Sequence, residues 1–479
     1  MSVHRRTKIV ATLGPASSSE AIINALVAAG VDVFRLNFSH GSVADHRDRA
    51  ERVRAAAAAC GHEVALLGDL QGPKIRIHCF REGAVELVAD APFVLDCALA
   101  SDAGDSECVG VDLPSLPESV FPGDVLILDD GRISLVVEAV RGQRVECRVR
   151  MGGRLSNRKG LNRLGGGLSA PSLTDRDLED IRHAAELGLD YLAVSFPLSA
   201  EDIREARKLA LAAGSEARII AKIERAEVVQ DETVLDAIIE AADGIMVARG
   251  DLGVEIGDAA LIGAQKMLIR KARRADRIVI TATQMMESMV QNPIPTRAEV
   301  FDVANAVLDG SDAVMLSAET ASGRYPVETV TAMAATCLGA ETWPEVRRSG
   351  HRADREFQRV DETIAMAAVY AANHLQGVAG MVCLTESGGT ALRMSRMSSG
   401  LPIFALSRHP ETVRRMCLFR GVRPLIFDYT VHPASEVAQA AVRELRERGL
   451  VRPGERLILT RGDLLGVGGL TTTLKIVEV

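Results

Sequence analysis

Short apolar runs alternate with helical segments along most of this chain, and that alternation limits the fold more than any other feature. Eight strands are predicted before residue 317, and a helical segment follows each of them. Strands joined by helices lie parallel, so the chain is predicted to be an α/β protein. Eight units are typical of a closed (β/α)8 TIM barrel, and their number and size favour it over an open doubly wound sheet. The predicted strands cover residues 8–13, 31–36, 64–67, 191–195, 218–222, 244–247, 277–281 and 312–316.

The alternation breaks once, between the third and the fourth strand. Residues 73–167 contain short β-like runs separated by Pro-Gly and Asp-Gly turns, with little helical periodicity. After the eighth strand, residues 346–479 return to alternating helices and strands. We therefore predict three domains: a barrel made of residues 1–72 and 168–345, an inserted β domain at 73–167, and a C-terminal α/β domain at 346–479.

Composition and charge argue against several classes of function. The net charge is −8 and no basic block stands out, so nucleic acid is not expected as a partner. The eight cysteines form no C-x-x-C pair, which indicates free thiols in a reducing compartment. The N-terminus lacks the apolar core of a signal peptide, and no apolar run is long enough to span a membrane. We expect a cytoplasmic protein that does not bind membranes.

Three charged residues that follow the fifth and sixth strands are the strongest candidate site. Lys222 and Glu224 are two positions apart on a strand, so their side chains project together. Asp251 follows the neighbouring strand, whose carboxyl end meets the same edge of the sheet. The carboxylates suit Mg²⁺ or Mn²⁺, and the lysine is a point charge for a phosphoryl oxygen. The alternative is an ordinary surface ion pair between Lys222 and Glu224.

Polar residues also follow the other strands, and together they describe a phosphoryl-transfer site. That chemistry needs positioning and charge neutralisation more than a covalent nucleophile. Each residue has a structural alternative: Arg35 as an ion pair at the rim, Asp69 as the cap of a turn, and Thr283 as the cap of a helix beginning at Gln284. The chain has neither a P-loop nor a G-x-G-x-x-G turn, so a nucleotide must be held in another way. The candidates at these strand ends include Arg35, Asn37, Ser39, His40, Asp69, Lys74, Arg76 and Thr283.

Seven long segments resemble the pyruvate kinase family, and the resemblance covers essentially the whole chain. It implies the bacterial type, with a (β/α)8 barrel, an inserted small β-barrel that acts as a lid, and a C-terminal α/β regulatory domain. The segments are RLNFSHG (35–41), GDLQGPKIR (68–76), AKIER (221–225), MVARGDLGVEI (246–256), TATQMMESM (281–289), PTRAEVFDVANAVLDG (295–310) and DAVMLSAETASGRYP (312–326).

The resemblance implies phosphoryl transfer from phosphoenolpyruvate to ADP, which gives pyruvate and ATP in the final step of glycolysis. Lys222, Arg35 and Thr283 would be catalytic, with Lys222 and Arg35 at the phosphoryl group and Thr283 near the carbon that is protonated. Glu224 and Asp251 would hold Mg²⁺ (or Mn²⁺). The family's remaining sites would fall on Ala248, Gly250 and Asp251 for the substrate carboxylate, and on Asn37, His40, Arg76 and Lys159 for the nucleotide.

The chain departs from the family pattern at the site of the monovalent cation. Family members that require K⁺ carry Thr and Glu where this chain has Leu70 and Lys74. The other matching positions, Asn37, Ser39 and Asp69, are unchanged. The ammonium of Lys74 could replace the missing charge, so the chain is placed in a K⁺-independent subgroup.

A loop in the C-terminal domain corresponds to the effector site of the family. It comprises Thr385, Glu386, Ser387, Gly388, Gly389 and Thr390, whose N–H groups could bind a phosphate. A simple capped turn is the alternative. A lysine that favours a bisphosphate in the family is here Glu386, so we expect activation by a sugar monophosphate or AMP and little response to fructose 1,6-bisphosphate. The loop at 462–469 could close over this ligand.

The sequence leaves two other functions open beside an allosteric, homotetrameric pyruvate kinase. One is a barrel lyase or mutase that acts on a similar substrate without forming ATP. The other is a non-catalytic homologue, which would be expected to have lost Lys222, Glu224 or Asp251.

Overall fold

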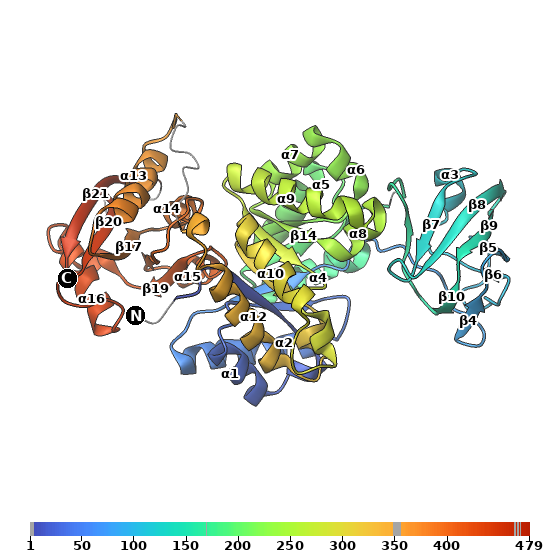
Figure 1. Ribbon diagram of the computed structural model, residues 1–479, viewed down its shortest axis with the longest axis horizontal. Coiled ribbons are helices and arrows are strands. Elements are labelled where there is room, and N and C mark those ends of the chain that lie inside the picture. Colours follow the sequence, from blue (N-terminus) through green and yellow to red (C-terminus); the bar gives the residue numbers. More distant parts are fainter. Residues whose placement is uncertain (1–3, 169, 348–355, 464–465, 467–468, 470) are drawn as a thin grey trace.

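The computed structural model describes residues 4–168, 170–347, 356–463, 466, 469 and 471–479. Eight parallel strands close into a barrel at its centre (Figure 1). They are β1 (Lys8–Leu13), β2 (Val33–Asn37), β3 (Ala65–Asp69), β12 (Tyr191–Val194), β13 (Arg218–Ile223), β14 (Gly244–Ala248), β15 (Ile278–Ala282) and β16 (Ala313–Leu316). The last strand pairs with the first, with Lys8 opposite Ala313. The closed barrel is therefore confirmed, and the open sheet was the wrong alternative.

Helices cover the outside of the barrel, and local hydrogen bonds fix where several begin. Ser42, Thr174 and Ser199 each accept the N–H of an aspartate three residues on, whose carboxylate accepts their own N–H in return. Gly61 ends its helix in the left-handed conformation, with φ of 60°. The helices are α1 (Glu20–Ala28), α2 (Val43–Cys60), α4 (Asp175–Glu186), α5 (Ala200–Ala212), α7 (Glu232–Ala241), α9 (Asp258–Arg274), α10 (Arg297–Asp309) and α12 (Pro326–Ala340).

Three additional short helices lie between barrel strands and outer helices. They are α6 (Ala226–Gln230), α8 (Arg249–Ile256) and α11 (Ala318–Ala321). No helix begins at Gln284: Thr283 and Gln284 have φ of 66° and 52°, and only a 3-10 turn at Glu287–Val290 follows. The structural alternative that Thr283 caps a helix was wrong, because two consecutive left-handed residues cannot start a right-handed helix.

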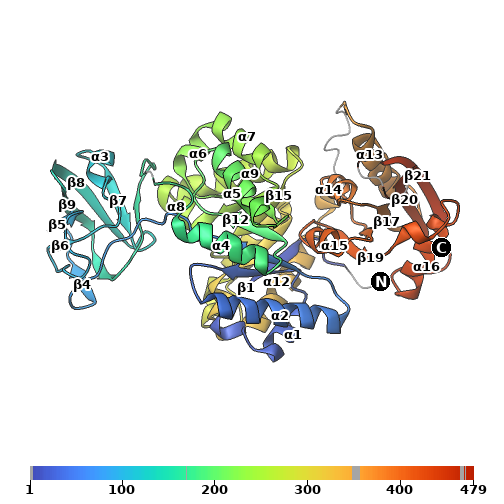
Figure 2. The same ribbon diagram turned by 180° about the vertical axis from the view of Figure 1, so that it is seen from behind.

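The insert lies at one end of the molecule and the C-terminal domain at the other, with the barrel between them (Figures 1 and 2). Within the insert, six strands form the sheet β11-β7-β8-β9-β5-β6, and β10 pairs with β4. The insert agrees with the predicted small β-barrel, because residues 76–77 bridge the two edges of this sheet: Arg76 pairs with Gly160 beside β11, and Ile77 pairs with Val111 beside the two-residue β6. Its elements are β4 (Ala84–Leu87), β5 (Pro92–Asp96), β6 (Cys108–Val109), α3 (Leu116–Ser119), β7 (Val125–Leu128), β8 (Ile133–Arg141), β9 (Arg144–Met151), β10 (Gly153–Ser156) and β11 (Leu161–Arg163).

The C-terminal domain is a five-stranded sheet with flanking helices. Its strand order is β19-β18-β17-β20-β21, and only β21 is antiparallel. The three domain boundaries stay predictions. The elements are α13 (Val360–His374), β17 (Val378–Leu384), α14 (Gly389–Ser395), β18 (Ile403–Ser407), α15 (Pro410–Met416), β19 (Val422–Ile426), α16 (Val437–Glu447), β20 (Arg456–Gly462) and β21 (Thr471–Glu478).

Buried polar contacts join the barrel to the C-terminal domain. Arg396, just after α14, forms an ion pair with Asp312 just before β16, and each side chain is only 1% exposed. Arg414 of α15 pairs with Asp190 at 2.8 Å. Trp343 lies where the chain leaves the barrel and is 57% exposed. The two domains thus share an interior of charged as well as apolar contacts.

Two further observations concern the chain as a whole. All eight cysteines are free. Within the described residues, no helix has both the length and the apolar composition needed to cross a lipid bilayer.

Candidate active site

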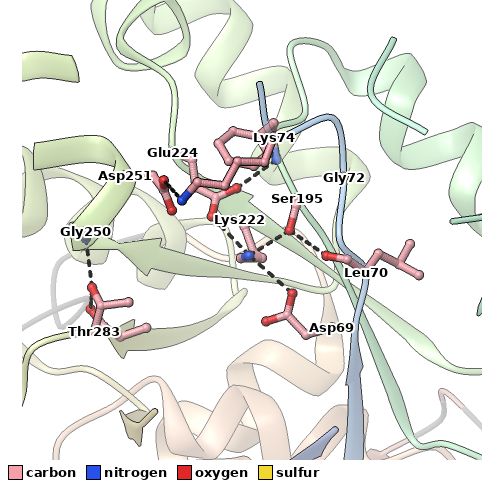
Figure 3. Close-up of polar contacts among 12 residues, drawn as sticks. Asp69, Leu70, Gly72, Lys74, Ser195, Lys222, Glu224, Gly250, Asp251 and Thr283 are labelled. Carbon is pink, nitrogen blue, oxygen red and sulfur yellow. Dashed lines mark hydrogen bonds and ion pairs between the residues drawn. The ribbon is translucent and has the colours of Figure 1, made fainter. Parts of the chain in front are cut away.

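Lys222, on β13, lies at the centre of a buried group of charges at the carboxyl end of the barrel (Figure 3). Its Nζ lies 3.0 Å from Oε1 of Glu224 and 3.2 Å from Oδ1 of Asp69. It also donates to Oγ of Ser195 at 2.6 Å. Both carboxylate side chains are 1% exposed and the lysine side chain is 12% exposed. The two residues therefore project together as predicted, but they are not a surface ion pair.

Asp69 carries the charge network on to β2. Its Oδ2 lies 2.6 Å from Nε of Arg35, whose Nη1 donates to the Thr12 hydroxyl at 3.0 Å. Asp69 is the last residue of β3 and caps no turn, and Arg35 is buried instead of lying at an exposed rim. The alternative for Asp69 was therefore wrong, whereas Arg35 does form an ion pair, but a buried one and not one at the rim.

The charges around Lys222 set its protonation and that of its neighbours. Burial alone would lower the pKa of Lys222, but the carboxylates of Asp69 and Glu224 outweigh it and raise the pKa well above its usual value. Burial would raise the pKa of Asp69, yet Arg35 and Lys222 hold it below its usual value. Lys222 therefore stays an ammonium, the form that attracts a phosphoryl oxygen.

Glu224 and Asp251 are the candidate metal ligands. Burial raises the pKa of Glu224; Lys222 opposes that shift, and the negative charge of Asp251 adds to it. A divalent cation bound by both carboxylates would relieve this repulsion, and carboxylate oxygens suit Mg²⁺, so the donors fit such an ion. Within the described residues, no cluster of three or more His, Cys, Asp or Glu side chains is arranged to hold a metal ion.

Lys74 is paired with a predicted metal ligand and not with the cation-site residues. Its Nζ lies 2.8 Å from Oδ1 of Asp251 and 3.7 Å from Oδ1 of Asp130. Asp69 is instead paired with Arg35 and Lys222.

Leu70 is buried, and its carbonyl oxygen accepts the Ser195 hydroxyl at 2.8 Å. Ser39 donates its backbone N–H to Oδ1 of Asn37 at 3.1 Å.

The first turn of α8 lies beside Thr283. Gly250 and Asp251 belong to this turn and Ala248 is its N-cap, so all three follow β14 directly. The Gly250 N–H donates to the Thr283 hydroxyl at 2.8 Å. Arg249 points away from the mouth: it pairs with Asp302 at 2.7 Å and donates to the Thr283 carbonyl, which braces the left-handed turn.

The four predicted nucleotide-binding residues are divided between two domains. Arg76 donates to the carbonyl of Arg158 at 2.9 Å, and Lys159 pairs with Asp129 at 2.6 Å, so both make their contacts within the insert. Asn37 and His40 share a turn after β2, where His40 donates its N–H to the Asn37 carbonyl at 3.1 Å. Among the described residues, no hydrogen bond or ion pair joins the two groups.

Sequence reasoning missed the contribution of β12. Its end supplies Ser195, which donates to Leu70 and accepts from Lys222, and Phe196, whose N–H donates to Oε2 of Glu224 at 2.8 Å. Phe196 has a φ of 54°. Ser195 ends a predicted barrel strand, so the rule applied to the other strands could have found it. The backbone contact of Phe196 has no sequence signal.

The predicted effector loop connects β17 to α14. Thr385 accepts the N–H of Gly388 at 3.0 Å, and Thr390 bonds to Thr471 at 2.7 Å. Glu386 bonds to the Tyr429 hydroxyl, to Nε2 of His409 at 2.6 Å and to Nε of Arg408 at 3.2 Å. Burial would raise the pKa of Glu386, but these three bonds lower it. Residues 464, 465, 467 and 468 of the predicted closing loop at 462–469 lie outside the described residues.

Comparison with known proteins decides the family. Residues 4–330 match the family described as "Pyruvate kinase, barrel domain", and residues 362–477 match "Pyruvate kinase, alpha/beta domain". The chain belongs to the pyruvate kinase family. It is 57% identical over 475 residues to "Pyruvate kinase II" of Salmonella typhimurium, a match that covers 99% of both chains. It is also 55% identical to "Pyruvate kinase" of Haemophilus influenzae, a match that covers 96% of both chains.

A solved structure agrees with this assignment. A pyruvate kinase from Cryptosporidium parvum superposes with a TM-score of 0.91 at 34% identity, over 99% of this chain and 96% of that one. The protein is therefore a phosphotransferase of the pyruvate kinase type. The lyase or mutase and the non-catalytic homologue considered from the sequence were the wrong alternatives.

Proposed function

We propose that the enzyme transfers the phosphoryl group of phosphoenolpyruvate to ADP, as the final step of glycolysis, in a Mg²⁺-dependent reaction. The supporting observation is the buried ammonium of Lys222, held between Asp69 and Glu224 at the barrel mouth. A fixed positive charge in a water-poor site stabilises the charge that develops on a transferring phosphoryl group.

The surrounding residues would share the work of binding and proton transfer. Arg35 and Lys222 contact the phosphoryl group, and the N–H groups at the start of α8, near Ala248, Gly250 and Asp251, receive the substrate carboxylate. Glu224 and Asp251 hold Mg²⁺ (or Mn²⁺), which when bound neutralises negative charge on the substrate oxygens. As the P–O bond to the substrate breaks and the bond to ADP forms, the remaining enolate accepts a proton at its terminal carbon, on the side of Thr283.

The insert would bring the nucleotide to this site. Arg76 and Lys159 on the insert, with Asn37 and His40 on the barrel, bind the nucleotide when the insert closes as a lid. Closure excludes water, so the phosphoryl group passes to ADP and not to hydrolysis.

An assay of pyruvate formation with and without ADP tests this function. We expect pyruvate to appear only with ADP, in step with ATP and only while Mg²⁺ or Mn²⁺ is present. Pyruvate release without ADP at a comparable rate, or full activity after complete chelation of divalent ions, would contradict the proposal.

We propose that the enzyme needs no added K⁺. Leu70 offers no side-chain oxygen for a cation, and the Lys74 ammonium already supplies a positive charge beside Asp251. Turnover in a K⁺-free assay buffered with Tris or tetramethylammonium is expected to stay within about tenfold, or ~1.4 kcal/mol, of turnover with K⁺. A larger fall would refute the proposal. The variant Lys74→Gln, which removes the ammonium, is expected to lose activity in the same buffer.

We propose that a monophosphate, either a sugar phosphate or AMP, activates the enzyme at the loop Thr385–Thr390. Glu386 pairs with Arg408 and bonds to Nε2 of His409, so a second phosphate would meet a carboxylate there. Monophosphates are expected to shift the phosphoenolpyruvate saturation curve, and fructose 1,6-bisphosphate is expected to leave it nearly unchanged. The variant Glu386→Gln should gain a bisphosphate response. A strong bisphosphate effect on the unaltered enzyme would rule the proposal out.

We also propose that the enzyme is a cytoplasmic homotetramer. Free thiols support a reducing compartment. Two sets of exposed apolar side chains support subunit contacts: Ile262 and Phe301 on α9 and α10, and Val360 and Tyr370 on α13. Sedimentation equilibrium would measure the mass of the assembly.

A further inference from the structure

A small charged cluster ties the insert back to the barrel and is not used by the site described above. The chain returns from β11 through Gly165, Gly166 and Gly167, whose φ values are 89°, 81° and 94°. Three consecutive residues in this conformation require glycine. We name residues 165–168 the return segment.

Barrel residues hold the return segment at three of its four positions. Gly165 donates its N–H to the backbone oxygen of Glu255 at 2.8 Å. Gly167 donates its N–H to Oε1 of Glu227 at 2.5 Å. The guanidinium of Arg225 donates to the carbonyl oxygen of Leu168. Because glycines alone would leave this segment free to rotate, these contacts set the direction in which the insert leaves the barrel.

The residues that hold the return segment lie close in the sequence to the candidate metal ligands. Arg225 directly follows Glu224, and Glu255 lies one helical turn after Asp251 on α8. The carboxylate of Glu255 joins α8 to the segment after β13, because its Oε2 accepts the Ala226 N–H at 2.8 Å. Its Oε1 accepts from Asn162 of β11 at 3.3 Å. One side chain therefore connects the metal-binding elements to the last strand of the insert.

The cluster is buried but incompletely bonded. Glu255 is 2% exposed and Arg225 is 5% exposed. Nε of Arg225 lies 3.7 Å from Oε1 of Glu255 and has no hydrogen-bond partner, and Oε2 of Glu227 also lacks one. Unmade bonds between buried charges are costly, so a small movement that shortens the Arg225–Glu255 distance is favoured.

The ionisation of Glu255 controls how strongly this movement is favoured. Burial raises its pKa to about 7, although Arg225 opposes the shift. The charged groups that face it are Arg225 and Glu227 on the segment after β13, while Arg163 on β11 is paired with Asp124. Above neutral pH, Glu255 is a carboxylate and attracts Arg225; below it, the attraction is lost.

We infer that Glu255 is a positioning residue for the lid: its carboxylate, with Arg225, fixes the return segment so that the insert can close over Lys222. This rests on the proposed function, in which closure precedes phosphoryl transfer. Glu255 touches no reacting atom and acts by holding residues 162–168 against α8. Its contribution is to the geometry of the closed state and not to substrate binding.

Hydrogen–deuterium exchange of the full chain tests the contact without depending on catalysis. In the variant Glu255→Gln at pH 8, amide exchange across residues 162–168, corrected for intrinsic rates, is expected to be about tenfold faster than in the unaltered enzyme. The control variant Glu232→Gln removes the same charge from a 77%-exposed side chain and should leave this exchange unchanged. Equal exchange in Glu255→Gln and the unaltered enzyme would overturn the inference.

Kinetics then test the consequence for the reaction. In Glu255→Gln, kcat is expected to fall about tenfold with KM for phosphoenolpyruvate changed less than about twofold. In the unaltered enzyme, kcat is expected to fall below pH 7 as Glu255 is protonated, and this fall should be absent in the variant. The variant Arg225→Lys, which cannot reach both partners, should act in the same way. A pH profile of kcat unchanged by both variants would overturn the inference. If the unaltered enzyme forms no ATP, the proposed function fails while the exchange result still decides the contact.

Discussion

Replacement of Lys222 by Met is expected to lower kcat by at least about 10³-fold, or ~4 kcal/mol. The ammonium lies within 3.0–3.2 Å of two carboxylates and is kept charged by them. Methionine has a similar length but no charge, so the phosphoryl group would meet Asp69 and Glu224 without the cation that shields it. The loss should appear in kcat and in kcat/KM alike, because the interaction grows as charge develops during transfer.

The same variant separates catalysis from folding. Loss of the ammonium leaves Glu224 buried with the Phe196 N–H as its remaining hydrogen-bond partner among the described residues, whereas Asp69 keeps Arg35. Circular dichroism and urea unfolding would establish that the variant is folded before kcat is measured. Lys208→Met is the matched control, because that lysine side chain is 76% exposed and its ion pair is with the surface residue Glu205. A kcat within tenfold of the unaltered enzyme in folded Lys222→Met would contradict the assigned role.

Replacement of Arg396 by Met is expected to destabilise the protein by about 3–5 kcal/mol, because it leaves a buried carboxylate without its cation. Nη1 of Arg396 lies 2.8 Å from Asp312 and donates to the Arg277 carbonyl at 2.7 Å. After the substitution, Asp312 keeps the N–H groups of Val279 and Arg420 as hydrogen-bond donors and the Arg420 guanidinium as a nearby charge, but it loses its direct ion pair. Urea unfolding should therefore begin at a clearly lower concentration.

Two further variants define the origin of that loss. Arg47→Met removes an exposed pair with Glu186, whose side chains are 54% and 58% exposed, and is expected to cost at most about 1 kcal/mol. Adding Asp312→Asn to Arg396→Met removes the stranded charge and should recover at least about 1 kcal/mol. The buried-pair explanation is wrong if Arg396→Met is no more sensitive to urea than Arg47→Met.

Much of the barrel could be predicted from the sequence because each unit carries local signals. The strand predicted at 31–36 is observed at Val33–Asn37, and the helix that follows begins at Val43, after the cap Ser42, and ends before Gly61, a stop signal that can be read from the sequence. Errors of one or two residues at strand ends reflect the lack of such caps on strands. The insert was less predictable, since β6 has two residues and β4 pairs with the distant β10.

Site residues at the ends of strands could be predicted from the sequence. Contacts between residues far apart in the sequence could not. Lys222 and Glu224 follow from their spacing on one strand. The pairing of Lys74 with Asp251 joins residues 177 positions apart, and that of Arg396 with Asp312 joins residues 84 apart. Neither pairing has a local signal. The left-handed turn at Thr283 could not be predicted either, because its neighbours Arg249 and Asp302 impose it.

The location of Trp343 has a practical consequence. It is the sole tryptophan of the chain and sits where the barrel passes into the C-terminal domain, two residues after Glu341, which accepts the N–H groups of Arg6 and Thr7. Because its ring is largely in water, its intrinsic fluorescence emission will shift when packing at this junction changes. The unlabelled enzyme thus carries a built-in optical reporter of the packing between the barrel and the C-terminal domain.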